Sequence, residues 1–198
     1  MLVKKILKKS FSLRKRLLDL SLKVSALHVG GSFSSAEIIQ TIFDIKKRKD
    51  KFILSKGHTG ILLYCILEQK GILKKKDVEN YCKKNGFLGV HPERYIEGVE
   101  ASTGSLGHGL GISAGMSLSK KFNNIYVLCS DGELMEGSLW ESVLMISSFR
   151  LNNIILFVDN NDLQSATRAS DTHPTLYPIS DKFKSFGWDA YNCNGHNP

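Results

Sequence analysis

Residues Ile125–Gln164 read IYVLCSDGELMEGSLWESVLMISSFRLNNIILFVDNNDLQ. Two apolar runs, Ile125–Cys129 and Ile154–Val158, are predicted to be buried strands, and Glu136–Arg150 between them has the length and periodicity of a helix. A strand, a crossover helix and a second strand form a right-handed unit in which the two strands are parallel. The sequence therefore predicts an α/β fold with a parallel sheet flanked by helices.

Polar residues with side-chain oxygens follow each of these predicted strands. Asp131-Gly132 follows the first strand and Asn161 follows the second. Because open α/β sheets bind ligands at the carboxyl ends of their strands, we expect Asp131 and Asn161 to lie side by side at such an edge. Their oxygens suit Mg²⁺ or Ca²⁺, a diphosphate can complete the coordination, and Gly132 leaves its backbone accessible. The same residues are also common in ordinary turns, so both interpretations are open.

The chain has 198 residues, of which 42% are hydrophobic, enough for one α/β domain with an ordinary core. Much of its net charge of +8 lies in Met1–Arg16, which contains lysines and arginines but no acid. Apolar residues recur there at helical spacing, which predicts a basic amphipathic helix over residues 1–26 with a solvated basic face. The pattern favours this interpretation over membrane or nucleic-acid binding, and we predict neither of those partners.

The four cysteines, Cys65, Cys82, Cys129 and Cys193, are scattered and include no CxxC pair. Their spacing favours neither a zinc site nor a disulfide framework, and we interpret them as reduced thiols. The chain has no apolar run as long as a membrane span, and lysines interrupt its N-terminus too often for a signal peptide. We therefore expect a cytoplasmic protein.

Three histidines occupy predicted loops or junctions. His28 precedes Gly30-Gly31, His58 lies between a predicted strand and a predicted helix, and His91 lies in an irregular segment that contains glycine. The junction of a strand end with a helix start favours anions. Taken one at a time, each histidine is also consistent with a purely structural role.

A glycine-rich segment, Ser102–Gly111, opens a predicted helix of small residues. Small residues permit the close approach of a ligand or of another helix. The segment lacks the Lys-Ser/Thr pair of a Walker phosphate loop, and it does not follow a convincing strand as a dinucleotide motif does. Further along the chain, Trp188–Tyr191 is predicted to be the last strand.

Several ordered motifs together resemble the transketolase family. They are SKGHTGILLY, HPERYIEGVEASTGSLGHGLGISAGM, SDGELMEGSLWE and VDNNDLQ, preceded by HVGGSFSSAEII. Asp131-Gly132 with Asn161 also resembles the thiamine-diphosphate motif, and the similarity runs from about Ser25 to Gly195. It implies that residues 1–198 form a single thiamine-diphosphate-binding module, the diphosphate module, shortened at the C-terminus.

The resemblance also implies roles for individual residues. Asp131, Asn161 and the carbonyl of Leu163 would ligate Mg²⁺ or Ca²⁺, and the three histidines, His28, His58 and His91, would be catalytic and would line the approach to the thiazolium carbon. The implied cofactor-binding residues are Gly104, Leu106, Asp131, Gly132, Glu133 and Asn161. Two positions depart from the family pattern, because Ser130 stands where many members have glycine and His108 where many have glutamine.

The resemblance finally implies a function. The chain would be the N-terminal subunit of a split transketolase, which moves a two-carbon ketol unit from a ketose phosphate to an aldose. A partner subunit would supply the pyrimidine module and the glutamate that activates the cofactor, and the subunits would associate further into a heterotetramer. Two alternatives are open: another thiamine-diphosphate enzyme, such as a deoxyxylulose-phosphate synthase or a 2-oxo-acid decarboxylase, or a truncated, non-catalytic binding subunit.

Overall fold

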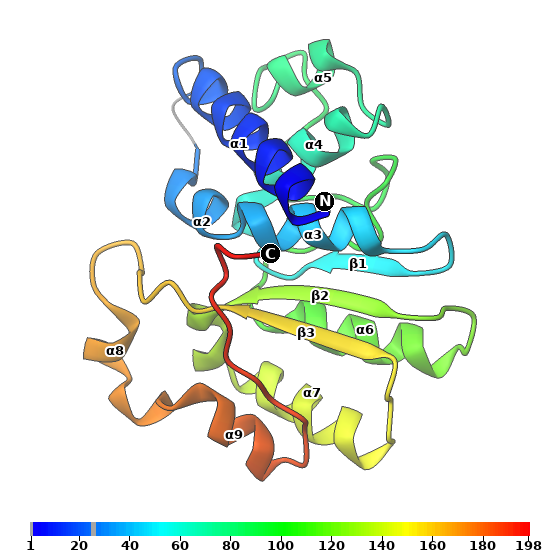
Figure 1. Cartoon of the computed structure of the whole chain (residues 1–198), viewed down its shortest axis with the longest axis vertical. Coiled ribbons are helices and arrows are strands. Elements are labelled where there is room, and N and C mark those ends of the chain that lie inside the picture. The colour runs from blue at the N-terminus through cyan, green and yellow to red at the C-terminus, as the bar shows by residue number, and fades with distance from the viewer. Residues whose placement is uncertain (1, 25–26) are drawn as a thin grey trace.

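The computed structural model describes residues 2–24 and 27–198. Within them a parallel sheet has three strands, β1 (Lys51–Leu54), β2 (Ile125–Ser130) and β3 (Ile154–Asp159), in the order β1-β2-β3. The central strand pairs with both neighbours, and its last residue, Ser130, lies opposite Asp159 at the end of β3. Figure 1 shows helices above and below this sheet. The predicted fold class is confirmed.

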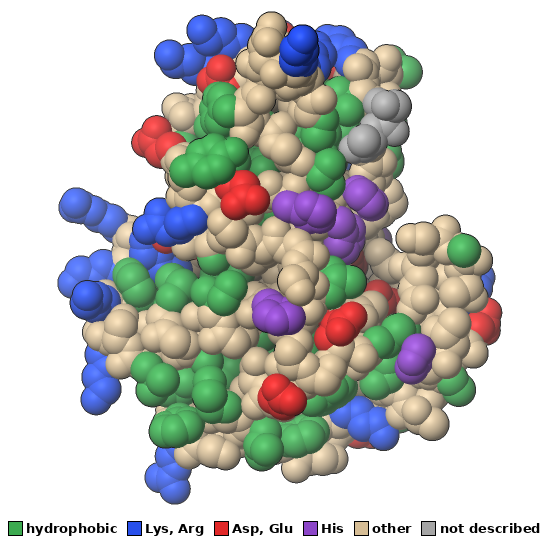
Figure 2. Space-filling model, turned by 180° about the vertical axis from the view of Figure 1, so that it is seen from behind, with side chains coloured by type: hydrophobic (Ala, Val, Ile, Leu, Met, Phe, Trp, Pro, Cys, Tyr) green, Lys and Arg blue, Asp and Glu red, His purple; other side chains and the backbone are tan. Residues whose placement is uncertain are grey.

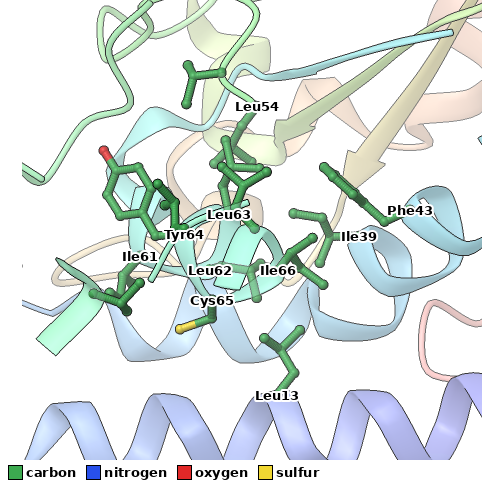
Figure 3. Close-up of a cluster of buried hydrophobic side chains, with 14 of the residues drawn as sticks. Leu13, Ile39, Phe43, Leu54, Ile61, Leu62, Leu63, Tyr64, Cys65 and Ile66 are labelled. Carbon is green, nitrogen blue, oxygen red and sulfur yellow. The ribbon is translucent and has the colours of Figure 1, made fainter. Parts of the chain in front are cut away.

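Five helices form the layer on one side of the sheet: α1 (Leu2–Ser21), α2 (Val29–Ser34), α3 (Ala36–Ile45), α4 (Gly60–Gln69) and α5 (Lys75–Glu79). The predicted amphipathic helix over residues 1–26 is found as α1, which ends at Ser21 because the apolar repeat ends there: Leu22 is 87% exposed. Residues 1, 25 and 26 lie outside the described part. Leu13 points from α1 into the core around α4, as Figure 3 shows.

The basic face of α1 differs from the solvated face that we predicted. Three of its cations reach acids on other elements: Lys9 pairs with Asp44 at 2.6 Å, Arg14 pairs with Glu37, and Arg16 pairs with Glu68 at 3.0 Å. These are partly buried contacts between helices that the amphipathic pattern does not reveal. Part of the N-terminal positive charge is therefore neutralised inside the molecule.

The layer on the other side of the sheet contains α6 (His108–Leu118), α7 (Gly137–Ser148) and α9 (Ile179–Ser185). Their apolar residues pack on the second face of β2, which is buried along its whole length. The predicted crossover helix is thus confirmed as α7. The short connecting helices are η1 (Gly57–Thr59), η2 (Asp131–Met135), α8 (Ala169–Thr172) and η3 (Pro174–Leu176).

The prediction of a last strand at Trp188–Tyr191 is wrong. The segment is extended, but it joins no ladder. Its indole Nε1 at Trp188 donates to the carbonyl oxygen of Val143 at 3.0 Å, and the ring packs edge-on to Phe183. The segment is therefore held by α7 and α9 rather than by the backbone of β3. Among the described residues, no helix is both long enough and apolar enough to cross a membrane.

Candidate active site

The turns that follow β2 and β3 meet at the carboxyl edge of the sheet. Asp131 begins η2 directly after β2, and Asn161 lies two residues beyond β3. The backbone N–H of Asp162 donates to Oδ2 of Asp131 at 2.7 Å. The structure therefore brings the two predicted residues together, as the parallel arrangement of the strands requires.

Asp131 is a buried carboxylate that is held by backbone donors. Its side chain accepts hydrogen bonds from the N–H groups of Gly132, at 2.9 Å, and Asp162, and the residue is 2% exposed. Burial raises the pKa of this carboxyl, and the two N–H donors oppose the rise. Within residues 2–24 and 27–198 the carboxylate has no ion pair. A buried carboxylate that lacks a counter-charge is suited to receive a cation.

Asn161 and Leu163 supply neutral oxygens beside this carboxylate. The amide of Asn161 donates to Oγ of Ser34 at 3.2 Å and accepts from the N–H of Leu163 at 2.9 Å, so its orientation is fixed. Among the described residues, no group of three His, Cys, Asp or Glu side chains is arranged to hold a metal ion. A hard cation here would use one carboxylate, one amide and one carbonyl oxygen, a donor set that fits Mg²⁺ or Ca²⁺. We call Asp131, Asn161 and Leu163 the oxygen side of the site.

Gly132 lies next to open space. A Cβ atom placed on it would meet nothing closer than Oγ of Ser130, at 3.8 Å. The packing of the protein therefore does not by itself explain a glycine at this position. The half-buried backbone after Asp131 is open to the approach of an anionic group.

The three predicted histidines, which we call the histidine side, come together although 63 positions separate His28 from His91 (91 − 28). The rings of His28 and His58 meet edge to face with centroids 5.4 Å apart. His91 packs against Gly104, where a Cβ atom would lie 2.9 Å from its ring. Figure 2 shows histidine side chains gathered near the middle of one face, away from the lysines and arginines along its edge.

His58 is half-buried between the exposed His28 and His91. Burial lowers the pKa of His58 to about 4, and the positive charge of Lys56 and the two neighbouring histidines lower it further, while Asp159 opposes them. The imidazole is therefore neutral at neutral pH. A neutral imidazole has one nitrogen free to accept a hydrogen bond or a proton.

Comparison with known proteins agrees with this geometry. A family model described as "Transketolase, thiamine diphosphate binding domain" matches residues 18–198. The chain belongs to the transketolase family. One of the two subunits of an apulose-4-phosphate transketolase, from Phocaeicola vulgatus, is 33% identical over 196 residues, which cover 92% of this chain and 69% of that relative. The 6-deoxy-6-sulfo-D-fructose transketolase subunit SqwG from Clostridium sp. is 33% identical, with 93% of this chain and 72% of the relative covered.

Solved structures show the same relationship. Transketolase from Campylobacter jejuni superposes with a TM-score of 0.89 at 25% identity, covering 99% of this chain and 34% of that one. Human transketolase is 32% identical over 185 residues, 30% of its length. This transketolase-family chain therefore spans about a third of the long transketolases and about seven-tenths of the two subunits.

Two residues outside the predicted set form a buried ion pair in this transketolase-family chain. Nζ of Lys56 lies 2.5 Å from Oδ2 of Asp159, with the two side chains 0% and 6% exposed. The hydroxyls of Ser34 and Ser35 also donate to Oδ2 of Asp159, at 2.5 and 2.7 Å. The signal that was available is a lysine at the end of an apolar strand, and an aspartate before the asparagines after β3.

Glu133 belongs to the predicted cofactor residues, and the structure places it beneath the site. It is 0% exposed. Its carboxylate accepts from Oγ of Ser55 at 2.5 Å, from the N–H of Gly107 at 2.9 Å and from the N–H of Ser130 at 2.9 Å. Burial raises the pKa of the Glu133 carboxyl, and these donors oppose the rise. Glu133 thus joins β1, β2 and the turn before α6, which carries Gly104 and Leu106.

Proposed function

We propose that this chain is the diphosphate-binding subunit of a two-chain transketolase, which transfers a two-carbon ketol unit from a ketose phosphate to an aldose. The observation that carries the proposal is the placement of the oxygen side and the histidine side at one edge of one sheet. They are linked through Ser34, whose hydroxyl donates to Asp159 and accepts from Asn161. Two relatives of similar extent are named as transketolase subunits, which supports a divided enzyme.

The oxygen side would hold the cofactor. Asp131, Asn161 and the carbonyl of Leu163 would bind Mg²⁺, or Ca²⁺ in its place, and through it the diphosphate of thiamine diphosphate. The open backbone at Gly132 would contact the diphosphate, and the turn with Gly104 and Leu106 would contact the aminopyrimidine. When bound, thiamine diphosphate supplies the nucleophilic carbon that receives the two-carbon unit.

The histidine side would handle the sugar. Neutral His58 would accept a proton from a sugar hydroxyl, and the exposed rings of His28 and His91 would donate to or accept from neighbouring hydroxyl or phosphate oxygens. Glu133 would act without touching the cofactor, by fixing the N–H of Gly107 and thereby the turn before α6. This division gives the chain both ends of a cofactor cleft.

The missing function is activation of the aminopyrimidine. We propose that a partner subunit provides the pyrimidine module with its glutamate, and that two such pairs form a heterotetramer. We further propose that the complex is cytoplasmic, in line with four cysteines that are free in the structure.

The test combines cofactor binding with product analysis. The chain would be titrated calorimetrically with thiamine diphosphate and Mg²⁺, alone and together with the pyrimidine-module chain that co-purifies with it. We expect binding that requires Mg²⁺ and the partner, followed by transfer of label from a ketose phosphate to an aldose. Consumption of pyruvate without ketol transfer would instead assign the complex to deoxyxylulose-phosphate synthesis or 2-oxo-acid decarboxylation. A lack of cofactor binding with the partner present would identify a non-catalytic subunit.

A further inference from the structure

The ammonium group of Lys56 is the most deeply buried positive charge near the site. All of its three hydrogen-bonding positions are used: it donates to the carbonyl oxygen of Gly31 at 3.0 Å, to Oγ of Ser35 at 2.9 Å and to Oδ2 of Asp159 at 2.5 Å. These partners come from α2, from the start of α3 and from the end of β3. Lys56 itself follows β1, so one side chain joins four segments.

The ion pair is a costly way to join these segments. Removing two charges from water costs free energy that their attraction does not always repay, and a pair of apolar residues often serves stability equally well. Asp159 has three close donors, because Ser34 and Ser35 add to Lys56 and all of them reach the same oxygen. The arrangement fixes an ammonium group at one point with high precision, which packing alone does not require.

The point that is fixed lies beneath His58. A Cβ atom placed on Gly31 would lie 3.5 Å from Nζ of Lys56 and 3.5 Å from Nε2 of His58. The ammonium and the imidazole nitrogen therefore border the same glycine, in the turn that follows His28. Gly31 is half-buried, which limits the screening of this short-range repulsion by water.

We propose that Lys56 is a positioning residue of the active site, which fixes the turn after His28 against the sheet and holds His58 in its neutral, proton-accepting form. This inference rests on the proposed function for its role in sugar chemistry. The charged or titratable groups that face His58 are Lys56, His28, His91 and Asp159. Only Asp159 favours the protonated ring, and its charge is committed to Lys56 and two serine hydroxyls. The low pKa of His58, about 4, agrees with this geometry.

The test is a titration of the histidine ring signals by NMR on the full chain, with the His58 signal assigned from its loss in His58→Gln. In Lys56→Met we expect the pKa of His58 to rise by about 1, because a nearby like charge has been removed. If Lys56→Met does not fold, the double variant Lys56→Met/Asp159→Asn replaces the ion pair by groups of similar volume, and a smaller rise is expected. An unchanged pKa of His58 in a folded variant, or a wild-type pKa at or above 6.5, would overturn the proposal.

Lys70→Met is the matched control. Lys70 also donates to a carbonyl oxygen, that of Phe43 at 2.9 Å, and to a carboxylate, that of Asp44 at 2.8 Å, but it lies on α4's far end away from the histidines. Its replacement should leave the pKa of His58 unchanged. Because the titration needs neither cofactor nor partner, a shifted pKa without transferase activity in the complex would refute the proposed function and retain the role of Lys56.

In the assembled enzyme, Lys56→Met should lower kcat and leave the affinity for thiamine diphosphate within about twofold of wild type. The acidic limb of the kcat profile should move to higher pH together with the pKa of His58. A purely structural lysine would instead lower the amount of folded protein and leave the pH profile of the remaining enzyme in place. An unmoved acidic limb, with the pKa of His58 shifted, would remove the link to catalysis.

Discussion

The oxygen side and the histidine side of the site treat buried charge in opposite ways. Asp131 is a buried carboxylate whose negative charge is met only by backbone N–H groups within the described residues. Lys56, beneath the histidines, is a buried cation whose charge is met in full by Asp159. The first side has a charge to offer an incoming cation, and the second is electrically closed. The difference assigns metal binding to the first side and the handling of neutral hydroxyl groups to the second.

The largest expected effect comes from removing the charge of the oxygen side. Asp131→Ala should weaken Mg²⁺-dependent binding of thiamine diphosphate by more than about 100-fold, because the only carboxylate of the donor set is lost. Calorimetry on the two-chain complex measures this. Asp162→Asn is the control, since its side chain faces Ser170 and Arg168 while its backbone N–H still reaches Asp131. Equal affinity in wild type and Asp131→Ala would end the division into two sides.

The second prediction addresses the histidine side. His58→Ala should lower kcat by about 100-fold or more, as expected for the loss of a proton acceptor, and should leave cofactor affinity nearly unchanged. His173→Ala, at an exposed histidine next to η3, controls for the loss of an imidazole. Steady-state kinetics with parallel calorimetry separates the two quantities. A loss of affinity equal to the loss of turnover would show that His58 belongs functionally to the oxygen side.

The third prediction concerns Glu133, which joins the two sides from below. Glu133→Gln should lower the free energy of unfolding by roughly 1–3 kcal/mol, because an amide nitrogen cannot accept from the N–H donors of Ser130 or Gly107. Urea unfolding of the isolated chain measures this. Glu141→Gln, on the exposed face of α7, should change stability by less than about 0.5 kcal/mol. Similar stabilities for the two variants would contradict the assigned hydrogen bonds.

How far the sequence alone reaches follows the same division. The oxygen side is local: β2 and β3 are apolar runs, each ends in short polar residues, and parallel pairing then brings Asp131 and Asn161 together. The histidine side was predicted only through the family resemblance, because nothing in the spacing of His28, His58 and His91 places them in contact.

Contacts between distant residues explain what the sequence did not reveal. Lys56 meets Asp159 across 103 positions and Ser55 meets Glu133 across 78, and neither pairing has a local pattern. The last strand was predicted from the residues Trp188–Tyr191, but strand formation depends on an available edge and on packing. Here the indole hydrogen bond and the aromatic contacts of Trp188 hold the segment on α7 and α9.

The smallest expected effect is a pH dependence that comes from His58. In the folded chain its pKa is about 4, below the ordinary value of 6.5, so between these values the unfolded state binds a proton that the folded state does not. The free energy of unfolding contributed by His58 is therefore intact above pH 6.5 and falls as the pH drops, with a slope of at most about 1.4 kcal/mol per pH unit. Below about pH 4 this contribution changes no further.

Raised carboxyl pKa values on the oxygen side act in the opposite sense, because Asp131 and Glu133 bind protons more readily when folded. The measurement is therefore a difference: urea unfolding of wild type and of His58→Gln at several pH values between 4 and 7. Wild type should lose stability relative to His58→Gln as the pH falls through this range, while His108→Gln, at an exposed histidine, should follow wild type. Parallel curves for wild type and His58→Gln would mean that His58 is not held neutral, and the histidine side would then be open to charge like its neighbour.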